Sequence, residues 1–106
     1  MRVLFDHCVP APLRRSLSAH DVKLTSELGW QGLMNGDLIA QAEAAGFNLL
    51  ISTDQNIRYQ QTVTGRSIAI LVLCKQNWPE LQPHVALVSR TVDEMRPGAY
   101  HEISFD

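Results

Sequence analysis

Three aspartates lie where this chain can carry out acid-dependent chemistry. Asp6 follows the apolar run 3–5, Asp54 follows the apolar stretch 47–52, and Asp37 lies in the first turn of the helical pattern that precedes that stretch. If the two apolar runs are parallel strands, Asp6, Asp54 and the start of the connecting helix share one edge of the sheet. Clustered carboxylates repel one another unless a cation or raised pKa values offset the repulsion. Hard oxygen donors suit Mg²⁺ or Mn²⁺, so this pattern predicts a metal site.

Each acid also has a structural interpretation. Asp54 can cap the turn that follows it, and Asp37 can interact favourably with the helix dipole. Asp6 is harder to explain in this way, because the next helix begins near Pro10, too far away for an ordinary capping bond. Asn56 offers an amide oxygen that can ligate a cation or bond within its own turn. The convergence of the three acids carries the metal interpretation, with Asn56 as a fourth ligand.

Four further residues are weaker candidates for substrate contact. Arg14 and Arg15 fall on the first predicted helix, and Arg58 follows the strand that ends before Asp54. Guanidinium groups bind phosphate well, although arginines on surface helices are usually only solvated. Asn35 is a good N-cap residue for the helix that carries Asp37, and it lies near the same predicted edge.

The elements that must hold these residues alternate between strand and helix. The near-continuous apolar stretch 47–52 indicates a strand buried on both faces, hence a parallel sheet covered by helices on both sides. The alternation predicts an α/β three-layer sandwich with a mainly parallel sheet of about five strands. In chain order we expect a strand at 3–5, a short helix at 9–20, a strand at 22–25, a loop at 26–36, a helix at 35–46, a strand at 47–52, a short helical turn or loop at 54–65, an interior strand at 67–74, the longest helix at 79–98 and an edge strand at 101–105.

Composition narrows the class of protein. A chain of 106 residues with 45% hydrophobic residues suits a single domain spanning 1–106. The formal net charge of −2 gives no global positive field, so a nucleic-acid site would have to be local. No apolar run reaches the length of a membrane span, and Cys8 and Cys74 lie in no paired metal-binding motif. We therefore expect a cytoplasmic protein with reduced thiols and no membrane contact.

Several short stretches follow the pattern of a known family. The stretch DHCVP at 6–10 follows the first apolar run, AHDV stands at 19–22, ELG stands at 27–29, and ISTDQNI at 51–57 ends the third predicted strand. In order and spacing these stretches resemble the small bacterial PIN-like domains, relatives of the PIN ribonucleases found as toxins in toxin–antitoxin modules. The resemblance covers about the first two thirds of the chain.

The resemblance implies a set of roles for the predicted site. Asp6 and Asp54 would be the principal ligands of one or two Mg²⁺ or Mn²⁺ ions, which activate a water for in-line attack on an RNA phosphodiester. Asp37 would be a further ligand or would orient that water. Asn56 would be a neutral ligand, since an amide oxygen can coordinate Mg²⁺ without adding charge.

The chain departs from the family at four positions. His7 and Cys8 replace an acid and an amide, and Asn35 and Asn56 replace acids. Two main hypotheses follow. The first is a metal-dependent ribonuclease, the toxin of a toxin–antitoxin pair, with RNA as substrate and an antitoxin protein or a second copy of the chain as partner. The second is a binding module with a weakened site, which acts through a protein or RNA partner. A phosphoacceptor receiver domain also fits the acids at the strand ends, but the chain lacks a convincing paired acid after the first strand. Lys75, after the fourth strand, is the one approach to the lysine that such a domain carries late in its sheet.

Overall fold

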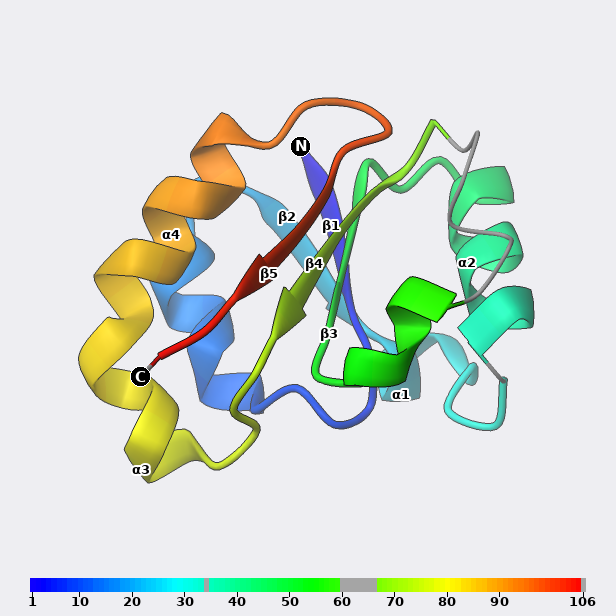
Figure 1. Cartoon of the computed structure of the whole chain (residues 1–106). Coiled ribbons are helices and arrows are strands. Elements are labelled where there is room, and N and C mark those ends of the chain that lie inside the picture. The colour runs from blue at the N-terminus through cyan, green and yellow to red at the C-terminus, as the bar shows by residue number, and fades with distance from the viewer. Residues whose placement is uncertain (34, 60–66, 106) are drawn as a thin grey trace.

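A parallel β-sheet organises the chain (Figure 1). The structure is a computed structural model and describes residues 1–33, 35–59 and 67–105, with the side chains of residues 35, 58 and 59 left out of the description. The five strands run in the order β2-β1-β3-β4-β5, and every neighbouring pair is parallel, which confirms the predicted sheet. Their bounds are β1 Arg2–Phe5, β2 Asp21–Leu24, β3 Leu49–Ser52, β4 Ala69–Leu73 and β5 Tyr100–Ile103.

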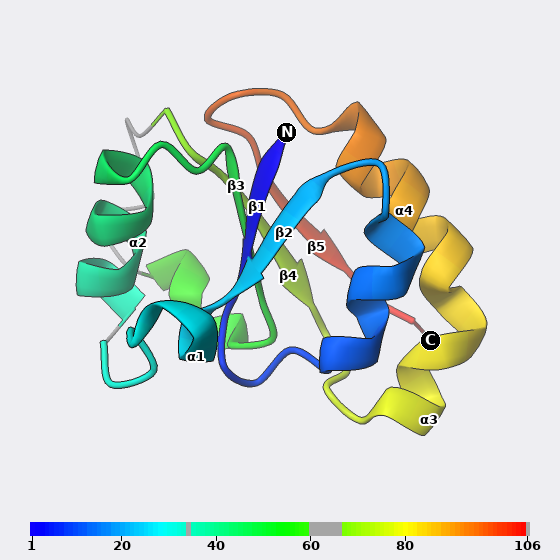
Figure 2. The same ribbon diagram turned by 180° about the vertical axis from the view of Figure 1, so that it is seen from behind.

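Both faces of the sheet are covered, as the apolar character of its inner strands requires. Every residue of β3 and β4 is buried. Side chains alternate between the two faces along a strand, so the inner strands β1, β3 and β4 supply two separate cores. One core joins the sheet to η1 (Ala11–Leu17), α3 (Trp78–Leu81) and α4 (Val85–Glu94), and the other joins it to α2 (Asn35–Ala44) and η2 (Gln55–Tyr59). Figures 1 and 2 show the resulting three layers, with η1, α3 and α4 on one side and α2 on the other.

Three predicted segments differ in detail from the structure. The helix expected at 9–20 is the shorter 3₁₀ helix η1, whose first turn is closed by a hydrogen bond from the Leu13 N–H to the Pro10 carbonyl at 3.1 Å. The loop expected at 26–36 contains the short helix α1, Thr25–Leu28, which ends at Gly29 with a φ of 73°. Neither segment has the sustained apolar period by which longer helices are predicted.

The longest predicted helix, at 79–98, is divided. It consists of α3, the 3₁₀ turn η4 (Gln82–His84) and α4, which ends at Glu94. Pro83 lies at the break, because its ring removes a helical N–H donor and crowds the preceding turn. The apolar stripe still points inward, with Leu81, Val88 and Val92 buried against the sheet. No helix in the described ranges is both long and apolar enough to span a bilayer.

The predicted end of α2 at Gly46 is confirmed in its geometry. Gly46 has a φ of 87°, and the bonds from the Gly46 N–H to the Glu43 carbonyl and from the Phe47 N–H to the Ala42 carbonyl close the helix. This is the Schellman arrangement that glycine favours. A Cβ at Gly46 would lie 3.0 Å from Nη1 of Arg2. That nitrogen is held in place, since it donates to the Ala45 carbonyl at 2.6 Å.

The turn at Gly46 gives a stability prediction. We expect Gly46→Ala to lower the free energy of unfolding by about 1–2 kcal/mol, because alanine is strained in the left-handed backbone conformation of this position. The close approach of the new Cβ to Arg2 adds a further loss. Gly29→Ala carries the backbone cost alone, because no atom lies within 4 Å of its added Cβ. Gly32→Ala has neither cost and serves as the control. Urea denaturation should rank the variants in this order, and equal stability of Gly46→Ala and Gly32→Ala would contradict the account.

Candidate active site at the carboxyl edge of the sheet

Asp6 lies one residue beyond β1, between the ends of two neighbouring strands. β1 pairs with β2 on one side and β3 on the other, and Phe5 is level with Leu24 and Ile51. The Asp6 N–H continues the ladder by donating to the Ile51 carbonyl at 2.9 Å. The residue is only 5% exposed. The sheet register therefore places the Asp6 carboxyl group at the carboxyl edge of the sheet, as the sequence predicts.

Three donors surround the Asp6 carboxyl group. The Ser52 hydroxyl donates to Oδ2 at 2.8 Å. The His7 backbone N–H donates to Oδ1 at 2.7 Å, and His7 Nδ1 lies 2.9 Å from the same oxygen. Because an ionised carboxylate only accepts hydrogen bonds, this contact requires a proton on His7 Nδ1. The other ring nitrogen, Nε2, takes no part in it. The His7 side chain is 57% exposed, so the pair connects a buried acid to the surface.

Ser52 joins Asp6 to the second predicted acid, Asp54. Its Oγ accepts the Asp54 N–H at 3.1 Å while donating to Asp6. Asp54 in turn accepts the Asn56 N–H on Oδ1 at 2.9 Å, and its carbonyl accepts the Ile57 N–H at 3.1 Å. Asp54 thus also caps η2, which confirms its structural interpretation. The two acids follow adjacent strands and share one hydroxyl.

The third acid does not complete a tight cluster. Asp37 lies exposed in the first turn of α2. Within residues 1–33, 35–59 and 67–105, no three His, Cys, Asp or Glu side chains are grouped closely enough to hold a metal ion. Asn56 is exposed beside Asp54. The structure brings Asp6 and Asp54 together through Ser52, but the three-acid convergence predicted with Asp37 is not found in this part of the chain.

The predicted substrate-binding residues divide into three groups. Arg14 forms an ion pair with Glu27 of α1. Arg15, its neighbour on η1, is exposed. The side chains of Asn35 and Arg58 lie outside the described part of the structure, so their predicted roles stay predictions.

The residues at this edge fit a hard cation in their chemistry. Asp6, Asp54 and Asn56 offer only oxygen ligands, the type that Mg²⁺ and Mn²⁺ prefer. A carboxylate has about four acceptor directions, and the Asp6 group uses three of them on Ser52 and His7. One direction on Asp6 therefore stays open for a ligand. A cation held by so few protein oxygens would keep several of its waters, as Mg²⁺ commonly does.

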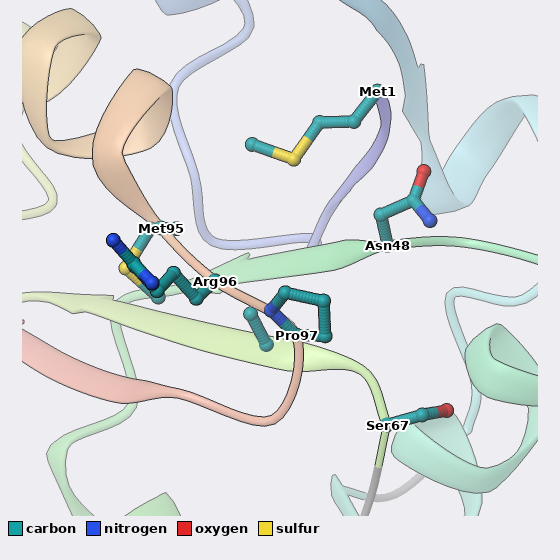
Figure 3. Close-up of a pocket in the computed structure, with 7 residues that line it drawn as sticks. Met1, Asn48, Ser67, Met95, Arg96 and Pro97 are labelled. Carbon is teal, nitrogen blue, oxygen red and sulfur yellow. The ribbon is translucent and has the colours of Figure 1, made fainter.

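Cavities occur at both edges of the sheet, and among the described residues a predicted acid lines the one at the carboxyl edge. Asp6 and His7 line a cavity of about 260 Å³ together with Thr25, which is 1% exposed and whose hydroxyl has no hydrogen-bond partner among the described residues. Figure 3 shows a cavity of about 240 Å³ at the opposite edge, lined by Met1, Met95 and other residues with no carboxylate among them. The two cavities are similar in size, so size does not indicate which is the functional site. The polar groups around Asp6 favour the cavity at the carboxyl edge.

Glu27 links the first helix to the beginning of α1. Its Oε1 accepts the Leu24 N–H at 2.8 Å and pairs with the Arg14 guanidinium. The Leu24 amide and then Arg14 hold the pKa of Glu27 below its ordinary value of 4.5. This contact supports the wall of the cavity that Asp6 also lines, because Leu24 is part of that wall.

Two residues at the site were not singled out by sequence reasoning. Ser52 is not among the predicted site residues, although its hydroxyl bonds to Asp6, 46 positions away. His7 was noted only as a departure from the family pattern, yet it contacts Asp6 directly. The strand register could have indicated Ser52, because it is the last residue of β3, immediately beyond the level of Phe5.

The bridging hydroxyl gives a second stability prediction. Ser52→Ala removes the donor to Asp6 Oδ2 and the acceptor of the Asp54 N–H, leaving buried polar groups unpaired, so it should cost about 1–3 kcal/mol of unfolding free energy. Thr25→Val is the matched control, because it removes a buried hydroxyl that has no partner in the described structure and should change stability little. Urea denaturation measures both. Equal losses in the two variants would show that the Ser52 bonds do not stabilise the site.

Glu27 gives a pH prediction. Because its pKa is lowered in the folded state, its stabilising contribution is complete above the unfolded value near 4.5 and is lost as the pH falls through the lowered folded value. Wild type and Glu27→Gln should therefore differ in urea midpoint at neutral pH and converge in acid. Midpoints measured across this pH range test the expectation, and a difference that persists or grows in acid would contradict it.

Comparison with known proteins returned no match. No family model matches the sequence, and neither a curated protein nor a solved structure matches it significantly. The function is therefore inferred from the geometry at the carboxyl edge and from the sequence pattern of the acids.

Proposed function

We propose that this protein is a metal-dependent ribonuclease of PIN-like type. The observation that carries the proposal is the pair Asp6 and Asp54, which follow neighbouring parallel strands and share the Ser52 hydroxyl. The carboxyl edge of a parallel sheet is where ligands bind in open α/β folds. An all-parallel sheet with helices on both faces is consistent with a PIN-like fold.

The proposed roles follow from the contacts of each residue. Asp6 and Asp54 hold Mg²⁺ or Mn²⁺, with Asn56 as a neutral ligand, and Ser52 fixes the orientation of Asp6. A bound divalent cation supplies an activated water and stabilises charge at the scissile phosphate. Asp37, exposed at the start of α2, contacts the site through a water or through substrate. Arg15, exposed on η1, contacts phosphate groups of the RNA, whereas Arg14 is held by its ion pair with Glu27.

The biological setting belongs to the same proposal. The likeness to PIN-like toxins supports a role as the toxin of a toxin–antitoxin pair, acting on RNA in the cytoplasm. Its protein partner would then be a small antitoxin that covers the carboxyl edge. A homodimer is compatible with this role.

A specific observation favours a second candidate function. The Asp6 oxygens already accept bonds from His7 and Ser52, and the described residues contain no third acid grouped with Asp6 and Asp54. Such a site suits a binding module that retains the fold and binds RNA or a protein without cutting. The two candidates differ in whether cleavage accompanies binding.

Cleavage and metal binding test the ribonuclease. Labelled RNA should be cut by the wild type with Mn²⁺ and left intact with EDTA. Asp6→Asn and Asp54→Asn should each lower the rate at least about 100-fold, since even partners that only orient a metal ligand are worth 10–100-fold. Mn²⁺ should also raise the thermal midpoint of the wild type more than that of either variant, because it binds the folded state.

Asp21→Asn is the matched control. Asp21 is an exposed aspartate at the first residue of β2, at the opposite edge of the sheet from Asp6. It should retain the wild-type rate and thermal response. RNA that stays intact with the wild type and Mn²⁺, or is cut equally by both site variants, contradicts the ribonuclease. Binding of RNA without cleavage supports the second candidate.

A further inference from the structure

Neighbouring cavities form a row along η1, starting at Asp6. The cavity of about 260 Å³ at Asp6 adjoins one of about 250 Å³, since both are lined by Ala11 and Leu24. The second adjoins a cavity of about 380 Å³, because both are lined by Pro12 and Arg15. We call this row, from Asp6 past Arg15 to Trp78, the η1 track. Figure 2 shows η1 beside α3 and α4, where the track ends.

Arg15 provides a positive charge in the middle of the η1 track. It lines both the second and the third cavity and is exposed. Nearby cations are already paired, since Arg14 contacts Glu27 and Lys75 Nζ lies 3.3 Å from a Glu80 oxygen. Arg15 has no ion pair in the described portion of the chain. Its guanidinium is therefore available to a phosphate group, for which arginine geometry is well suited.

Trp78 provides an aromatic surface at the far end. It begins α3 just after β4, so it lies on the same carboxyl edge as Asp6. The side chain is half-buried, packing against the core while lining the third cavity. A fixed indole with one accessible side is a good platform for a nucleobase. Trp30 does not have this position, because it meets Phe47 edge-on at 6.0 Å on the α2 side.

We propose that the η1 track binds single-stranded RNA, with Arg15 contacting a phosphate and Trp78 stacking on a base of the strand that reaches Asp6. The proposal rests on the ribonuclease function and extends it by assigning the substrate form and two contact residues. Stacking on Trp78 requires an unpaired base, which a duplex does not present. Arg15 lies between Asp6 and Trp78 along the track. A strand bound there can place a phosphate at Arg15 and stack a base on Trp78 while its backbone reaches Asp6.

Binding measured without cleavage tests the track. The probe is a fluorescently labelled oligouridylate, titrated with protein in EDTA and followed by anisotropy. Trp78→Leu and Arg15→Gln should each weaken binding about tenfold, given the usual energies of base stacking and charge-assisted contacts. Trp78→Phe should retain most of the affinity, because phenylalanine also stacks. Arg90→Gln, an exposed arginine on α4 that lines none of these three cavities, is the control and should bind as the wild type does.

A spectroscopic readout separates contact from folding. The chain has two tryptophans and two tyrosines, so in a Trp30→Phe background the fluorescence excited selectively from tryptophan reports on Trp78 alone. Oligouridylate should quench it, whereas the same RNA annealed into a duplex should not.

Equal affinity of all variants, the absence of quenching, or a preference for duplex overturns the track. If one of these results occurs but RNA is still cut in Mn²⁺, the ribonuclease proposal stands and only the track is overturned. RNA that is neither bound nor cut contradicts both proposals. Equal binding of single-stranded DNA supports the track, since phosphate and base contacts need no 2′-hydroxyl.

Discussion

The hydrogen bond between the hydroxyl of Ser52 and the carboxyl group of Asp6 is the interaction on which this site depends. It spans two strands, β1 and β3, that are neighbours in space but far apart in sequence. The same oxygen accepts the Asp54 N–H, so one small side chain contacts the carboxyl group of Asp6 and the backbone of Asp54. The position of Ser52 follows from the parallel register, and that register follows from the apolar residues that both sheet faces bury.

Burial of Asp6 imposes a constraint on its surroundings. A carboxyl group withdrawn from water is costly unless donors surround it. Ser52 and His7 supply those donors, and His7 does so from the next position along the chain. The same contacts that make the acid compatible with the core also occupy most of its acceptor directions. Structural stability and the proposed cation binding would therefore use the same few oxygen lone pairs of Asp6, and a substitution at His7 would affect both.

The sequence predicts the strands better than it predicts the contacts at the site. The β3 and β4 segments are short apolar runs bounded by polar residues, and both occur where expected. The prediction of one long helix was wrong, because the apolar stripe continues past Pro83 although the proline interrupts the helical backbone. The links between Asp6, Ser52 and His7 depend on which strands pair and on side-chain direction, and neither can be read from one chain without a register. Trp78 likewise gains significance only when α3 lies beside η1.

The order of strands has a consequence for when the site comes into existence. Asp6 and Ser52 are 46 positions apart, and the chain between them contains η1, the edge strand β2, α1 and α2, so their bond exists only once β3 pairs with β1. Parallel pairing across such an interval closes a long loop and is slow compared with helix formation. A nascent or partly folded chain thus carries both acids but no assembled centre. For a protein proposed to cut RNA in its own cell, this topology delays any such activity until the sheet has formed.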